Sequence, residues 1–199
     1  FQQVSGKLFS YPLLDVCLQQ IESGMYKDII PIQLYYLCYI LSTNGNEDSF
    51  QQLQLLLKKH EHQFTESELK DIYLLAINFC IQELNTGKQH FAQYAYDLYL
   101  YALQKEFLLD NGELSRFTFK NIAFIGIKKL NAYKSVEQFI ENYKNKISLE
   151  YRENTVQFVK ATLFFAQKEY KKAVLILQKI EFEDILWNLD AKSMLLKMY

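Results

Sequence analysis

The stretch that decides the fold is ATLFFAQKEYKKAVLILQKI, residues 161–180. Within it, Tyr170 is followed three residues later by Ala173 and four residues after that by Leu177, so the three share one face of a helix. The same spacing of an aromatic residue, a second residue on the same helix face and an aliphatic residue occurs three more times: Phe50, Leu53, Leu57; Phe91, Tyr94, Leu98; and Tyr133, Val136, Ile140. The four units start 41, 42 and 37 residues apart. Near-even spacing in this range predicts a stack of helical hairpins.

Composition favours an all-α protein without disulfides or metals. Half of the 199 residues are hydrophobic, which is enough to bury a sizeable core. Only 6 glycines and 2 prolines are present, too few for the many strand reversals of a β-sandwich, and no paired strands are expected. The cysteines Cys17, Cys38 and Cys80 are widely spaced in apolar runs and are expected to be small buried hydrophobes. Such usage favours a reducing, cytoplasmic setting, and no membrane span or signal segment is expected.

Turn and capping signals divide the chain into expected helices. Asn44-Gly45-Asn46, Asn85-Thr86-Gly87 and Asp110-Asn111-Gly112 are turns, and Thr65 followed by Glu68 predicts reciprocal capping of the next helix. The expected helices cover about 11–23, 31–43, 47–60, 66–84, 88–108, 113–130, 134–147, 152–167, 170–180 and 185–199. With no linker or change of composition, residues 1–199 are expected to form a single domain. The apolar final helix lacks a stop signal, so this domain is expected to be a fragment of a longer chain.

The segment 152–181 resembles a tetratricopeptide repeat (TPR). Ala161 and Phe164, then Tyr170, Ala173 and Leu177, stand where that family has a small and an aromatic residue in its first helix and an aromatic, an Ala and a bulky residue in its second. The resemblance implies a right-handed α-solenoid of antiparallel hairpins, about four hairpins plus flanking helices. The first two hairpins depart from the family, because their spacing exceeds its 34-residue repeat and because Leu53 and Tyr94 stand where Ala is expected. An irregular helical bundle is the alternative.

The sequence offers little to catalysis. It has no glycine-rich phosphate loop, no serine elbow and no paired-cysteine motif. His60 and His62 would point about 200° apart on a helix, so they are not expected to share a metal, and His90 stands alone. The acidic cluster of Glu66, Glu68 and Asp71 suits a helix start. We therefore expect a protein that is not an enzyme and has no cofactor or metal.

Charge is unevenly distributed and indicates the kind of partner. Residues 1–100 carry a net charge of −5, whereas residues 116–179 carry +8. A basic segment can attract an acidic peptide or the phosphates of a nucleic acid, although lysines on a solvated surface would give the same balance. The tyrosines at 35, 36, 39, 94, 96, 99 and 101 are expected to be divided between core and surface. Exposed tyrosines suit a protein interface, and core packing with only the hydroxyl at the surface is the alternative.

The TPR resemblance also suggests which residues face a binding groove. Its groove positions fall on Thr118, Asn121, Ile125, Lys128 and Lys129. Polar donors between apolar walls suit a peptide. The leading hypothesis is a noncatalytic scaffold that binds a protein or peptide along the concave face of a helical solenoid, and the basic segment suits an acidic partner. The alternative is the helical sensor or regulatory domain of a larger nucleic-acid-linked protein.

Overall fold

A computed structural model describes residues 13–180 and 185–198, and the regular structure of these residues is almost entirely helical. The prediction of an all-α protein is thereby confirmed. The chain divides into two compact units, residues 1–79 and 80–199, with the boundary inside the helix α5 (Glu66–Asn85). Each unit is described by itself, and the single domain of residues 1–199 stays a prediction.

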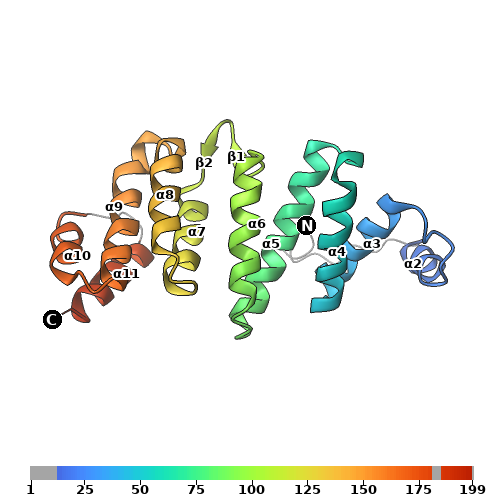
Figure 1. Ribbon diagram of the computed structural model, residues 1–199, viewed down its shortest axis with the longest axis horizontal. Helices are drawn as coiled ribbons and strands as arrows, with labels where there is room; N and C mark the ends of the chain where they lie inside the picture. Colours follow the sequence, from blue (N-terminus) through green and yellow to red (C-terminus); the bar gives the residue numbers. More distant parts are fainter. Residues whose placement is uncertain (1–12, 181–184, 199) are drawn as a thin grey trace. The chain divides into compact units, whose positions relative to one another are not determined.

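The first unit contains α2 (Leu14–Glu22), α3 (Ile30–Thr43), α4 (Glu47–His60), the short 3-10 helix η1 (Glu61–Gln63) and the start of α5 (Figure 1). Helix α3 packs against both α2 and α4. The core of the first unit includes Leu34, Leu37, Leu41, Phe50, Leu53 and Leu57. The ring of Phe50 also stacks on Phe79 with 5.5 Å between ring centroids.

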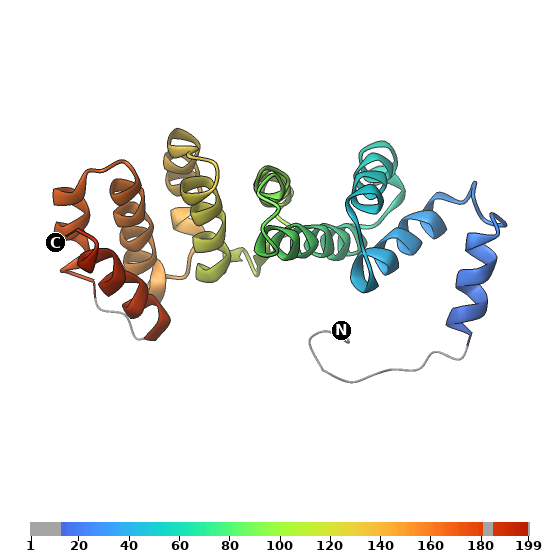
Figure 2. The same ribbon diagram turned by 90° about the horizontal axis from the view of Figure 1, so that it is seen from below.

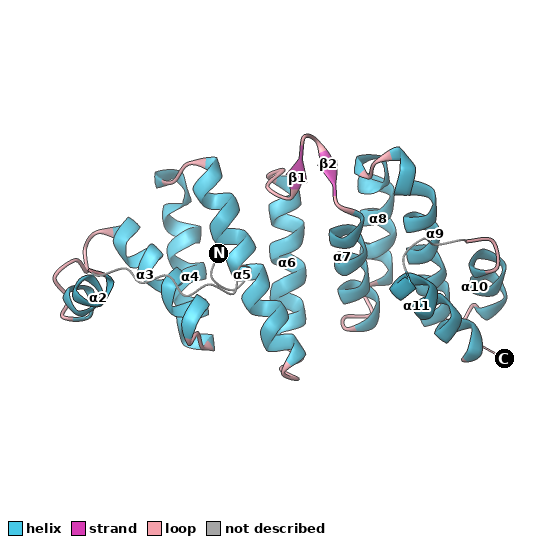
Figure 3. Cartoon of the chain, turned by 180° about the vertical axis from the view of Figure 1, so that it is seen from behind, coloured by secondary structure: helices cyan, strands magenta, loops and turns pink. Residues whose placement is uncertain are grey.

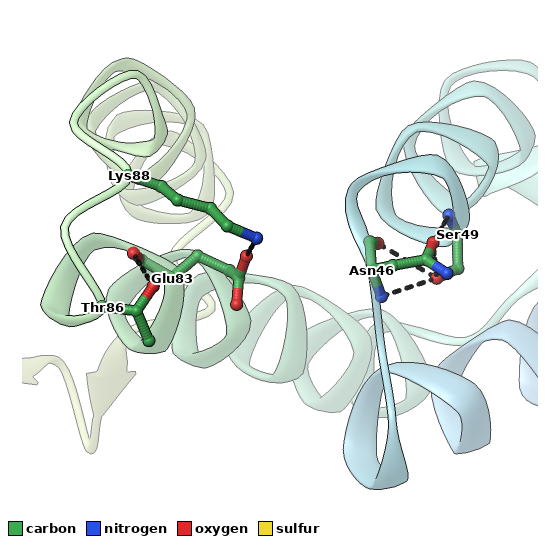
Figure 4. A network of polar contacts seen from close by, with 5 residues as sticks. All are labelled: Asn46, Ser49, Glu83, Thr86 and Lys88. Atoms are coloured by element: carbon green, nitrogen blue, oxygen red, sulfur yellow. Dashed lines mark hydrogen bonds and ion pairs between the residues drawn. The ribbon is translucent and has the colours of Figure 1, made fainter.

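Polar caps explain where two helices of this unit begin. At α4, the backbone N–H of Ser49 donates to Asn46 Oδ1 at 2.9 Å, and the backbone N–H of Asn46 donates to Ser49 Oγ at 3.1 Å (Figure 4). At α5, the N–H of Thr65 donates to Glu68 Oε2 at 2.8 Å, and the N–H of Glu68 donates to Thr65 Oγ1 at 3.3 Å. Both caps satisfy donors that a helix start leaves unpaired. The capping predicted for Thr65 and Glu68 is confirmed.

The second unit continues from the end of α5. It contains α6 (Phe91–Gln104), strands β1 (Leu109–Asp110) and β2 (Glu113–Leu114), α7 (Arg116–Lys128), α8 (Tyr133–Tyr143), η2 (Lys144–Lys146), α9 (Leu149–Ala166), α10 (Tyr170–Leu177) and α11 (Ile185–Leu196). Helix α7 packs against α6, α8 and α9, and α10 lies beside α9 (Figure 1 and Figure 2). Every predicted helix has a counterpart among the described residues.

The expectation of no paired strands is wrong at one place. β1 and β2 form a two-residue antiparallel ladder, which Figure 3 shows in magenta between α6 and α7. The two loop residues, Asn111 and Gly112, have φ of 50° and 82°. Positive φ at both positions is the geometry of a type I′ turn, whose twist matches that of paired strands. Helix α7 consequently begins at Arg116 rather than at the predicted Glu113, after the N-cap Ser115.

Helix α6 ends earlier than predicted, at Gln104 instead of residue 108. Glu106 has φ of 60°, and the backbone N–H groups of Glu106 and Phe107 donate to the carbonyl oxygens of Leu103 and Ala102. This is a Schellman motif, which normally has glycine at the positive-φ position. A glutamate gives no such signal, so the pattern analysis missed this helix end.

The aliphatic residues of the repeated units belong to the core, whereas two of the four rings, Tyr133 and Tyr170, are not buried. All four aliphatic members, Leu57, Leu98, Ile140 and Leu177, are buried, and so are Phe50 and Phe91. Tyr170 departs from this pattern with 43% of its side chain exposed. Ala161 on α9 and Ala173 on α10 are fully buried, in agreement with a close approach of these two helices.

The prediction for the cysteines is correct for one residue and wrong for another. Cys80 is buried, Cys38 is half-buried and Cys17 is exposed, and all three thiols are free. Burial raises the pKa of Cys38 to about 12. Cys17 is exposed because α2 contains no buried residue at all. Its apolar sequence neighbours suggested a core position that the packing of α2 does not create.

Candidate functional site

A pocket of about 220 Å³ lies in the second unit, between the last turn of α5 and the second half of α7. It is lined by Ile81, Leu84, Asn85, Asn121, Phe124, Ile125, Lys128 and Lys129. Four of the five residues predicted to line a groove are therefore brought together at one cavity. The fifth, Thr118, is half-buried and lies outside it.

Helix geometry explains why α7 presents these side chains together. Asn121, Ile125 and Lys128 are four and three residues apart, so they share one face of the helix. Ile125 is 7% exposed and forms part of the wall, while Asn121 and Lys128 are exposed. The arrangement combines an apolar wall with polar groups at its edge.

The other wall is the end of α5, which stops at a glycine. Gly87 has φ of 102°, and the N–H of Lys88 donates to the carbonyl of Glu83 at 3.1 Å. Figure 4 shows the Lys88 ammonium on the Glu83 carboxylate and the Thr86 hydroxyl on the Glu83 carbonyl oxygen, the latter at 2.8 Å. These contacts hold the last turn of α5, which carries Leu84 and Asn85 into the pocket lining.

The amide of Asn121 is oriented by a buried tyrosine of α6. Burial raises the pKa of Tyr99, and the hydrogen bond from Asn121 opposes that shift. Tyr96, the neighbouring buried tyrosine, hydrogen-bonds through its hydroxyl to Ser135 Oγ at 2.9 Å. Both belong to the core, whereas Tyr35 in the first unit is 45% exposed. The tyrosines are thus divided between core and surface, as expected.

Lys128 is a pocket residue whose pKa is shifted by its surroundings. It is an exposed residue, yet its ammonium lies 4.0 Å from the centroid of the Phe124 ring. Its pKa is lowered, chiefly by desolvation and also by the nearby charges of Lys120 and Lys197, while Asp190 acts in the opposite direction. Lys129, by contrast, donates from Nζ to Gln89 Oε1 at 3.3 Å. Among the described residues, neither lysine has a carboxylate within ion-pairing distance.

A row of cations and rings continues along α7 away from the pocket. The Arg116 guanidinium lies 4.1 Å from the ring centroid of Tyr151, and the Lys120 ammonium lies 4.6 Å from that of Trp187. Lys120 is also 3.9 Å from Asp190 on α11. Phe124, Tyr151 and Trp187 were not among the residues expected from the sequence, and Trp187 is a core residue with 2% of its surface exposed. The spacing of Phe124 four residues before Lys128 was the available signal for one of these pairs.

The histidines do not form a site among the described residues. No cluster of three or more His, Cys, Asp or Glu side chains suited to a metal occurs in residues 13–180 and 185–198. The rings of His60 and His62 are 6.4 Å apart at the end of α4, and His90 is exposed just before α6. Within the same residues, no helix has the length and apolarity needed to cross a bilayer.

Comparison with known proteins adds no relative. No protein-family model matches the chain, and neither a curated protein nor a solved structure is significantly similar to it. The pocket itself is therefore the feature that indicates a function.

Proposed function

We propose that this chain is a noncatalytic scaffold that binds a protein or peptide segment at the pocket between α5 and α7. The observation that carries the proposal is the lining itself, where apolar walls stand beside two amides and two lysines. Asparagine side chains both donate and accept, so Asn85 and Asn121 are suited to the N–H and C=O groups of an extended peptide. Apolar walls with a few oriented polar groups are typical of binding sites.

We place the chain in the class of TPR-like, right-handed α-solenoids. The packing of α7 on α9 and of α10 on α9 supports this assignment, because stacked hairpins bury the faces that one hairpin leaves open. Buried Ala161 and Ala173 support it too. The free thiols agree with a reducing compartment such as the cytoplasm.

A random peptide library displayed on phage tests the proposal, since it carries no assumption about sequence. The wild-type chain should enrich a related set of peptides. Asn85→Phe should abolish this enrichment, because a large ring at an exposed lining position would fill the pocket. Gln82→Phe adds the same ring to an exposed position of α5 outside the lining and should have no effect. A library without any enriched peptide would refute peptide binding.

A second candidate function is binding of single-stranded nucleic acid along α7. Arg116 at the start of α7 favours it, because an arginine guanidinium is suited to bidentate contacts with phosphates. The affinity for a labelled RNA oligonucleotide would then fall steeply with salt, with a slope of about −0.7 for each phosphate contacted. An affinity that barely changes with salt would exclude this function.

A further inference from the structure

We propose that the α5–α7 pocket selects a peptide in which one bulky apolar side chain is flanked by aspartate or glutamate. The apolar side chain enters the pocket, and the flanking carboxylates meet Lys128 and Lys129. This inference rests on the proposed function and narrows it to a class of ligand.

The size of the cavity indicates a single side chain. A cavity of about 150 Å³ can hold a benzene ring, whereas sites for cofactors and drug-sized ligands span about 300 to 1,000 Å³. At about 220 Å³, the pocket has room for one Leu, Met or Phe side chain but not for a nucleotide. The ligand must therefore present an isolated anchor rather than a large rigid body.

The walls that meet this anchor are apolar on both sides. Ile81 and Leu84 come from α5, while Phe124 and Ile125 come from α7. Leu84 and Ile125 are 8% and 7% exposed, so little of their surface faces water before binding. Affinity gained from such walls follows the apolar area of the entering side chain.

The charge at the rim is positive and lacks a direct ion pair among the described residues. Lys120 has Asp190 at 3.9 Å, but among the described residues Lys128 and Lys129 have no carboxylate within 4 Å. The Lys128 ammonium instead lies over the Phe124 ring, where Lys120 and Lys197 add like charge and Asp190 offsets part of it. An incoming carboxylate would relieve that repulsion, whereas a basic residue would add to it.

The same contacts argue against a nucleic acid at this pocket. Base stacking needs an open ring face, and the Lys128 ammonium lies over one face of the Phe124 ring at 4.0 Å. No arginine, the residue suited to bidentate phosphate contacts, lines the cavity. A peptide with carboxylates requires neither feature.

Four fluorescent synthetic peptides test the inference by anisotropy. The peptides have the same length and differ only in the central residue and in the charge of the flanking residues. They carry leucine flanked by acidic residues, serine flanked by acidic residues, leucine flanked by Asn and Gln, and leucine flanked by lysines. The acidic leucine peptide should bind at least about tenfold more tightly than each of the others, because either change removes one class of contact. Equal binding of the serine peptide or of the Asn and Gln peptide would overturn the inference.

A matched pair of charge reversals assigns the binding to this rim. The double variant Lys128→Glu with Lys129→Glu should bind the acidic leucine peptide at least about tenfold more weakly than the wild type does. It should bind the lysine peptide more tightly. Lys58→Glu with Lys59→Glu is the control, because these lysines are also adjacent, exposed and at the end of a helix. The control should bind as the wild type does, and circular dichroism should show that both variants are folded. Equal affinity of the two double variants would overturn the inference.

Other occupants of the site are distinguishable in the same experiments. Phage peptides that depend on the pocket but lack acidic residues would leave the proposed function standing and overturn this narrower inference. Displacement of the acidic leucine peptide by a uridine oligonucleotide, or dimerisation of the chain that is lost in Lys128→Glu with Lys129→Glu, would overturn it as well. Failure of the library to enrich any peptide would refute both.

Discussion

Single residues set how closely the helices of the second unit approach one another. Gly126 on α7 is the clearest case, because a Cβ atom built there would lie 2.5 Å from Val136 Cγ2 and 3.0 Å from Tyr96 Cε2. Val136 is fully buried, and Tyr96 is buried with its hydroxyl bonded to Ser135. Neither neighbour can move without disturbing the core. A glycine inside a helix usually costs stability, so this one is explained by packing.

The first prediction is that Gly126→Ala destabilises the protein. A better helix former would add about 1 kcal/mol of stability. Overpacking against α6 and α8 should cost about 1 to 3 kcal/mol, and the rigid neighbours place this case at the upper end. Urea unfolding should therefore show a net loss of about 1 to 2 kcal/mol. In Gly126→Ala combined with Val136→Ala, the loss should be smaller than the sum of the two single losses. If Gly126→Ala were more stable than the wild type, the neighbouring side chains of α6 and α8 would have moved aside without a cost in stability.

At the scale of elements, side-chain contacts tie the start of α5 to α3. Tyr35 on α3 donates to Glu68 Oε1 at 2.5 Å, and the same glutamate caps α5. The bond from Tyr35 is the main cause that lowers the pKa of Glu68, followed by the bonds from Thr65. The carboxylate in turn raises the pKa of Tyr35 to about 12. The ionised glutamate therefore serves two elements at once.

The second prediction concerns pH and follows from this shift. A carboxyl with a folded-state pKa below its unfolded value of 4.5 adds stability above that pH, and this stability is lost as the pH falls through the folded-state pKa. The wild type should lose stability on acidification, and Glu68→Gln should lose less. Urea midpoints at neutral pH and below about pH 3 measure both losses. Glu66→Gln, an exposed neighbour on the same turn, is the control. Equal acid sensitivity of Glu68→Gln and the wild type would contradict this role.

The third prediction concerns the contact between α9 and α10. Ala173 is fully buried on α10, which packs against α9. Ala173→Leu should lower stability by about 1 to 3 kcal/mol, because the added methylenes would force the two helices apart. Lys171→Leu, two residues away at an exposed position of α10, should change it little. Equal melting temperatures for Ala173→Leu and the wild type would show that Ala173 does not lie at the contact between α9 and α10. Ala173 would then no longer support the TPR-like register.

At the scale of the whole molecule, helices account for nearly all regular structure among the described residues. The ladder of β1 and β2 pairs only two residues on each side. The fourth prediction is therefore a far-ultraviolet circular dichroism spectrum of the helical type. Gly112→Val should leave its shape unchanged even though it strains the positive φ of the turn. A substantial sheet signal in the wild-type spectrum would contradict the fold.

The amino-acid sequence by itself determined most elements, because their signals are local. Helical spacing of rings and aliphatic residues placed α4, α6, α8 and α10 and their buried faces. Asn46, Thr65 and Gly87 marked helix ends through hydrogen bonds that span only a few residues. The TPR resemblance selected four α7 residues that line the pocket and one, Thr118, that does not. Such features need no knowledge of distant segments.

Only the tertiary structure decided features that depend on distant partners. The pocket exists because α7 stands against the end of α5, and Asn121 is oriented by Tyr99 of α6. Burial of Cys80 and exposure of Cys17 follow from what covers each helix, although both cysteines have apolar sequence neighbours. Each of these features depends on contacts between residues that are remote in sequence. The helical periodicity of the sequence does not reveal such contacts.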